Sequence, residues 1–154
     1  MVQALADLLP TLTAWTDITT DPDAVNVGAW PNPDHLPAGP AALVRPPLLT
    51  CQLHARESRR WLGTVGLELL LPVPSSSDLG GEALSCLAAV ASLRDSMALA
   101  DLHPFAVISS IEVSSFEPGE WASLTQGPDD EEQTVTRQAG YKALLSVSVQ
   151  SLGL

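Results

Sequence analysis

Few side chains in this sequence have the types and spacing that catalysis or metal binding requires. Cys51 and His54 come nearest to a metal-ligand or nucleophile pair. They fall in a predicted strand, where positions three apart point to opposite faces, so the two cannot easily share one ligand. The other histidines, His35 and His103, are scattered and form no triad or zinc spacing. We therefore expect no metal and no cofactor.

Three neighbouring carboxylates, Glu112, Glu117 and Glu120, have the side-chain type needed for acid–base catalysis. Glu112 falls on the polar face of a predicted strand and the other two fall in a turn. Nothing in the sequence marks a cleft around them, so we interpret them as solvated surface. Gly80-Gly81 opens a predicted helix, but it lacks the lysine and the further glycine of a phosphate-binding loop. The sequence thus predicts no enzyme and no catalytic residue.

Two charged clusters are better suited to contacts than to catalysis. One is an acidic run in a predicted loop, made of Asp129, Asp130, Glu131 and Glu132. Such a run is usually a solvated loop tip, and the sharper alternative is an acidic channel wall that repels DNA phosphates. The other is the single basic cluster, made of Arg56, Arg59 and Arg60. It is either plain surface or a partner for the acidic loops of a neighbouring copy.

Two tryptophans stand in the two longest predicted loops, Trp30 in 17–40 and Trp121 in 118–140. A loop tryptophan often anchors the loop to its own core, and tryptophan is also a favoured anchor of protein interfaces. Both interpretations stay open at this point. We take the two tryptophans, together with the arginine cluster, as candidate subunit-contact or partner-contact residues.

The stretch 60–102 organises the predicted fold. Arg60 to Val73 alternates apolar residues at period two and predicts one long strand. Leu79 to Leu102 carries apolar residues at helical spacing around much of its circumference, which predicts a long helix covered on more than one side. Val2 to Leu9 predicts a first helix, which Pro10 should break and which should run on to about Trp15.

Further strands are predicted at 25–30, 41–45, 48–55, 105–116 and 141–152. The strand 105–116 is expected to alternate, with one apolar face and one face of serine and charge. The last strand is expected at a sheet edge or paired with another subunit. Together the elements predict an α+β fold: a mostly antiparallel or mixed β-sheet, an N-terminal helix, one long helix packed on one face and two long loops, 17–40 and 118–140, in a single domain 1–154.

Composition excludes several classes of partner. The chain has 154 residues and a formal net charge of -11, so it should repel free DNA and anionic membranes. It could still mimic DNA or line a passage through which DNA slides. No window is long and apolar enough to span a bilayer, and the N-terminus lacks the basic region of a signal peptide. Cys51 and Cys86 lie in apolar surroundings and are interpreted as free thiols, which points to a reducing cytoplasm.

The order of these elements resembles that of the tail terminator proteins, also called tail completion or neck proteins, of long-tailed bacteriophages. The matching parts are Val2 to Leu9, Trp61 to Val73, Leu79 to Leu102, Val107 to Phe116 and Tyr141 to Leu152. The resemblance implies a structural virion protein, assembled in the host cytoplasm as a homo-hexamer ring. Such a ring caps the tail tube, ends its polymerisation and joins the tail to the head.

The resemblance also implies the partners: further copies of the chain, the tail tube protein and a head-closure or connector protein. Genomic DNA would pass through the ring without specific binding, and no membrane or cofactor would be involved. Another neck or tail subunit is the nearest alternative, and a tube subunit would stack into open cylinders rather than stop at one ring. An acidic DNA-mimic inhibitor is a further alternative, but it needs two regular rows of acids on one face, whereas here the acids scatter over loops.

Overall fold

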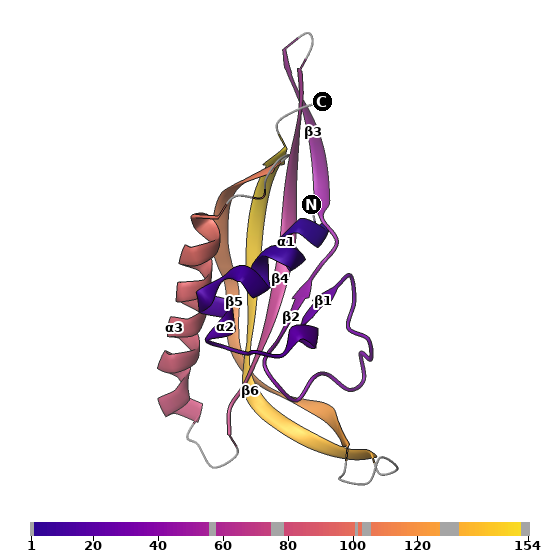
Figure 1. Ribbon diagram of the computed structural model, residues 1–154, viewed down its shortest axis with the longest axis vertical. Coiled ribbons are helices and arrows are strands. Elements are labelled where there is room, and N and C mark those ends of the chain that lie inside the picture. The colour runs from indigo at the N-terminus through magenta and orange to yellow at the C-terminus, as the bar shows by residue number, and fades with distance from the viewer. Residues whose placement is uncertain are drawn as a thin grey trace.

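Six strands form one mixed sheet in the order β1-β2-β4-β6-β5, and β3 pairs with β4 outside this path (Figure 1). This computed structural model describes residues 2–55, 58–74, 79–100, 102, 106–126 and 133–151. The strands are β1 Val25–Val27, β2 Ala41–Val44, β3 Leu48–Ala55, β4 Ser58–Pro72, β5 Ala106–Gln126 and β6 Gln133–Ser151. In the described ladders, β1 pairs with β2 in parallel and the other pairs are antiparallel. The predicted α+β class is confirmed.

Four of the described helical segments lie over one face of this sheet (Figure 1). They are α1 Val2–Leu8, η1 Leu9–Thr11, α2 Thr13–Thr16 and α3 Leu79–Ala98, and a short turn η2 Pro22–Ala24 precedes β1. Pro10 stands in η1, so the predicted break in the first helix is confirmed. α3 ends four residues before the predicted limit at Leu102. No helix in the described part of the chain is long and apolar enough to cross a membrane.

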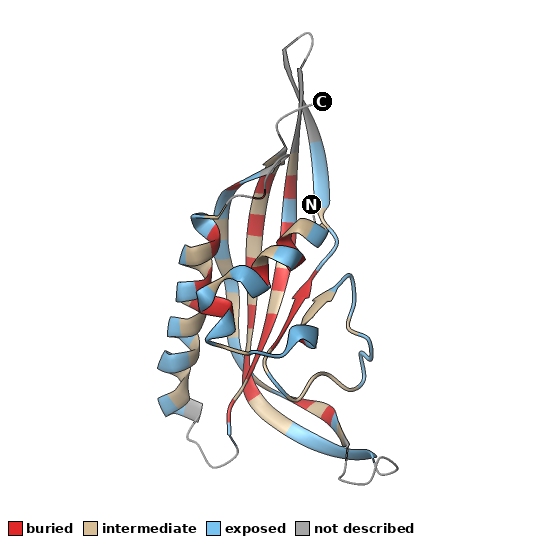
Figure 2. Cartoon of the chain, in the orientation of Figure 1, coloured by how far each residue is buried: buried red, intermediate tan, exposed pale blue. Residues whose placement is uncertain are grey.

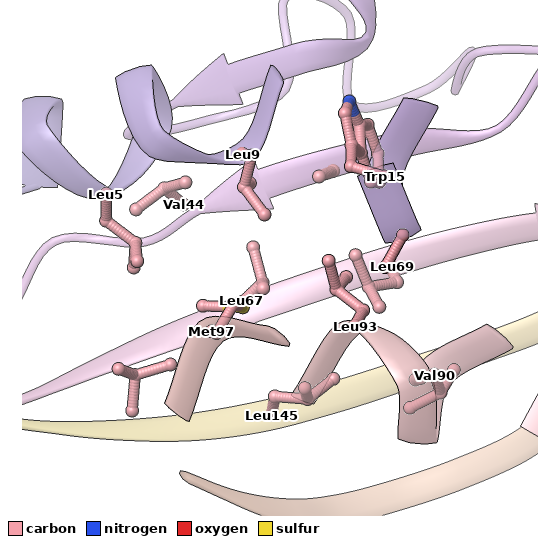
Figure 3. Close-up of a cluster of buried hydrophobic side chains, with 14 of the residues drawn as sticks. Leu5, Leu9, Trp15, Val44, Leu67, Leu69, Val90, Leu93, Met97 and Leu145 are labelled. Atoms are coloured by element: carbon pink, nitrogen blue, oxygen red, sulfur yellow. The ribbon is translucent and has the colours of Figure 1, made fainter. Parts of the chain in front are cut away.

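One face of the central strands supplies most of the main core. Alternate residues of β4 and β6 are buried, and Figure 2 shows them as red stripes along both strands. In Figure 3, Leu67 and Leu69 of β4 and Leu145 of β6 meet side chains from the helices. The helix contributions drawn there are Leu5, Leu9, Trp15, Val90, Leu93 and Met97. The long strand and the long helix that the sequence predicts therefore contribute to one core, and α3 itself lies over β5 and β6.

Strand β5 does not keep the simple alternation expected for 105–116. Its register against β6 shifts between Ile108 and Ser110 and again between Val113 and Ser115. Each shift is a β-bulge that leaves one extra residue, Ser109 or Ser114, without a directly opposite partner. Without the bulges, apolar residues would fall on both faces. With them, Ile108, Ile111, Val113 and Phe116 all pack against the core from one face.

The sequence predicts a loop over 118–140, but this prediction is wrong for most of the range, which is strand. β5 continues through Pro118 to Gln126, and β6 starts at Gln133. Pro118 does not end the strand, because β5 is an edge strand, where a sheet accepts proline. The two strands form a long hairpin that curls toward the side of β1 and β2 (Figure 1).

The sequence suggested that the last strand lies at a sheet edge or pairs with another subunit. The structure instead places it inside the sheet. β6 lies between β4 and β5 and pairs with both along most of its length. The hairpin with β5 satisfies one side of β6, and β4 satisfies the other. The edges of the sheet are instead β5 on one side, and β1 and β3 on the other.

α3 is covered by the chain on one side only, in contrast to the expectation from its apolar circumference. Val90, Leu93 and Met97 are fully buried. On the opposite arc Leu84 is 76% exposed and Leu99, just past the end of the helix, is 90% exposed. The described chain therefore leaves an apolar helix surface in contact with solvent.

We predict that Leu93→Ala lowers the free energy of unfolding by about 2–5 kcal/mol, because it leaves a cavity in the main core. Leu84→Ala in the same helix removes the same atoms from an exposed site and should change stability by less than about 0.5 kcal/mol. Urea unfolding at concentrations where the chain is monomeric measures both. Equal losses in the two variants would contradict the packing described here.

Candidate functional site

The described side chains form no recognisable reactive centre. Among them, no three His, Cys, Asp or Glu residues are grouped closely enough to hold a metal ion. Burial, and to a smaller extent the charge of Glu82, raises the pKa of the Cys86 thiol above its usual value. Cys86 therefore stays protonated at neutral pH and is a poor nucleophile. The carboxylates Glu112, Glu117 and Glu120 are exposed, as expected for surface residues.

The face of the sheet opposite the helices has a second, smaller buried region. All four residues of β2 are buried, although only Ala42 and Val44 belong to the main core. The buried residues that lie outside that core are Ala41, Leu43, Leu70, Trp121 and Ser123. A strand buried on both faces needs a second cover. The proline-rich connection between β1 and β2 provides part of it.

Trp121 fastens this connection to the β5–β6 hairpin. Its indole Nε1 donates a hydrogen bond to the carbonyl oxygen of Pro37 at 2.8 Å, and the backbone N–H of Leu36 donates to the carbonyl of Ala122 at 2.9 Å. The Lys142 ammonium lies 5.8 Å from the centre of the Trp121 ring, within the range of a cation–π contact. Of the two roles left open for Trp121, the structure shows an anchor within its own chain.

Beside this anchor, the proline-rich connection and strands β2 and β4 enclose an open groove of about 460 Å³. Its apolar lining includes Trp30, Pro33, Leu36, Leu43 and Pro46. Trp30 is only half-buried, so part of its ring remains available to a partner. The groove is therefore open, and much of its lining is apolar.

An ion pair lies on the wall of the groove. The Arg45 guanidinium donates to the Glu68 carboxylate at 2.6 Å, and the stem of Arg45 crosses Gly66. The Arg45 side chain is 48% exposed, so the pair contributes at most about 1 kcal/mol to stability. Arg45 also continues the β2 pairing, because its N–H donates to the Gly66 carbonyl at 2.8 Å. Pro46 and Pro47 follow Arg45 and separate β2 from β3.

Sequence reasoning missed Arg45 and Glu68, although a signal was present. Glu68 is the single acid inside a long apolar strand, and Arg45 stands between a predicted strand and two prolines. A buried or half-buried charge requires a partner. Their pairing across the sheet depends on the register of β2 against β4, which the sequence does not specify.

The other predicted contact residues fall in three places. Arg59 and Arg60 occupy the outer end of β4, where they pair with Leu53 and Gln52 of β3. Arg56 and the acidic run Asp129, Asp130, Glu131 and Glu132 lie outside the described residues. Trp30 lines the groove, and Trp121 lies beneath the proline-rich connection. The structure therefore does not bring Arg59 and Arg60 into one cluster with the two tryptophans.

Comparison with known proteins leaves the family open. No family model matches this chain, and no curated protein is significantly similar to it. We therefore infer the function from the fold and from the surfaces described above.

We predict that Gly140→Ala destabilises the protein by about 1–3 kcal/mol by overpacking. A Cβ at Gly140 would lie 2.8 Å from both Pro72 Cα and the Trp121 ring, and closer still to the Leu71 carbonyl oxygen. Gly119, its direct partner across the hairpin, is the matched control, because a Cβ there meets only the Lys142 side chain at 3.8 Å. Thermal and urea unfolding should separate the two variants, and equal stability would contradict this close crossing.

Proposed function

We propose that this chain is a structural subunit of a long-tailed phage virion, a tail terminator that forms a ring on the tail tube. The ring ends tube polymerisation, joins the tail to the head-neck connector and lets DNA pass through its lumen. The observation that carries the proposal is the order of elements in the fold. An N-terminal helix, a long strand, a long helix packed on the sheet and a final strand occur in the sequence positions on which the resemblance rests.

The edges of the sheet support assembly with identical copies. Strand β5 forms one edge, and β1 and β3 form the other. Exposed sheet edges invite pairing or contact with other chains. Because the two edges differ, copies would join head to tail, and a head-to-tail arrangement that closes is a ring.

The helix-free face of β5 and β6 is suited to a lumen. Along β5 this face carries exposed Ser110, Glu112 and Glu117, and on β6 it carries Ser146, Ser148 and a lysine, Lys142, which lies opposite Glu117. On a chain of net charge -11, such a face repels DNA phosphates and offers them no basic groove. We assign this face to the wall of the DNA passage.

We predict that the purified chain assembles into one closed ring, with a mass several times the 16.2 kDa of a single chain, and that it caps tail tubes. Light scattering gives the mass, and electron microscopy of mixtures with tail tubes shows the cap. A chain that stays monomeric and does not join tubes would contradict the proposal.

The same experiment separates the nearest alternatives. A tail-tube subunit would stack into open cylinders, and a head-closure protein would bind the connector without capping tubes. A DNA-mimic inhibitor would bind and block a DNA-processing enzyme. The exposed acids on β5, Glu112, Glu117 and Glu120, follow one strand and do not form two regular rows.

We predict that Glu112→Lys with Glu117→Lys makes the assembled ring bind short duplex DNA at least about tenfold more tightly than the wild type, in a salt-dependent manner. Asp7→Lys with Asp17→Lys is the control, because it changes the net charge equally at exposed positions of the helices. Filter binding at several salt concentrations measures both. Equal binding by the two variants would contradict the assignment of the β5–β6 face to the lumen.

A further inference from the structure

α3 has a solvent-facing arc that is mostly apolar. It contains Leu84, Leu87, Ala88, Ala91, Asp95 and Ala98, with the exposed Ser85 and Ser92 at its border, and Leu99 follows at the end of the helix. Leu84, Leu87 and Leu99 are 76%, 43% and 90% exposed. A helix that is apolar all round is normally buried on all sides. This outer face of α3 therefore lacks a cover that the described chain does not provide.

A second apolar surface lies on the opposite side of the sheet. The groove beside Trp30 opens there. At the start of β3, on the same edge of the sheet, Leu48 is 75% exposed on the face of the groove and Leu49 is 46% exposed on the other face. We call the groove and these two leucines together the β2–β3 side. In Figure 1 the α3 helix lies on the left of the sheet, and the connection that forms the groove lies on the right.

We propose that the outer face of α3 of one copy docks on the β2–β3 side of the next copy. This inference rests on the proposed ring, and it names the surfaces that hold the ring together. The two surfaces differ and lie on opposite sides, so each copy can use both at once. That arrangement generates a ring or a filament, whereas a two-fold dimer would need one self-complementary surface.

The dimensions and the direction of the two surfaces agree. From Leu84 to Leu99 the helix surface is about 22 Å long at 1.5 Å per residue. From Leu43 in the groove to Leu49 the strand side is about 20 Å long at 3.3 Å per residue. α3 and the β2–β3 run point the same way along the long axis (Figure 1). In a ring of many copies, each copy is rotated only modestly relative to its neighbour, so α3 of one copy and the β2–β3 run of the next still point the same way. This alignment places Leu84 and Leu87 of one copy at the groove of the next.

The charges are also compatible. Asp95 lies on the outer arc of α3, is 70% exposed and pairs with Arg94 at 3.1 Å. Arg45 on the groove wall is 48% exposed and pairs with Glu68. Each surface carries one acid and one base, which limits repulsion between copies of this strongly acidic chain.

The experiment uses two variants of the full chain, each altered at exposed residues. The helix variant carries Leu84→Glu and Leu87→Glu, and the strand variant carries Leu48→Glu and Leu49→Glu. We expect each to raise the concentration for half-assembly at least about thirtyfold in light scattering. Val135→Glu, on the β5–β6 hairpin, alters an exposed apolar residue outside both surfaces and should leave assembly unchanged. Circular dichroism at concentrations where the wild type is monomeric should give all variants the wild-type melting temperature.

Mixing the two variants tests the head-to-tail arrangement directly. The strand variant keeps an intact helix surface and the helix variant keeps an intact β2–β3 side, so the mixture should form 1:1 dimers and no rings. A wild type that forms rings, with variants that assemble equally well, would overturn this inference and leave the proposed function standing. Rings of the helix variant that fail to cap tubes would also overturn it, by assigning the α3 face to the tube protein. A wild type that neither assembles nor joins tubes would overturn both proposals.

Discussion

The antiparallel pairing of β4 with β6 is the contact on which the rest of this structure depends. The ladder runs from Trp61 opposite Ser151 to Pro72 opposite Gly140. Both strands bury alternate residues on the same face, including Leu67 against Leu145, and the helices pack on that face. Antiparallel strands with one apolar face require such a cover, so the position of α3 follows from this ladder. The other strands attach to its two sides.

The lower end of this ladder also organises the second face. At Gly140 the hairpin passes so close to β4 that no side chain fits between them, and the Trp121 ring fills the adjacent space. Trp121 then holds the proline-rich connection through its hydrogen bond to Pro37. The connection covers Leu43 and forms the groove. A local crossing of two backbones thus shapes a surface that a partner could use.

Both proposals rest on surfaces that the folded chain leaves incomplete. A monomer gains nothing from exposing Leu84 and Leu99 to water, because apolar burial is the main favourable term in folding and association. A large exposed apolar patch usually marks an interaction site. Contact with identical copies explains both the unpaired sheet edges and the exposed apolar face of α3. The ring proposal and the docking of α3 on the next copy both follow from such contact.

The sequence by itself determined the type and order of most elements. Alternation in 60–73 and helical spacing from Leu79 specify β4 and α3, because local periodicity decides which face can be buried. Only the tertiary structure decided the register. The bulges at Ser109 and Ser114, the central place of β6 and the pairing of Arg45 with Glu68 all depend on which residues lie opposite one another. Those pairings join residues far apart in the chain, and local patterns contain no record of them.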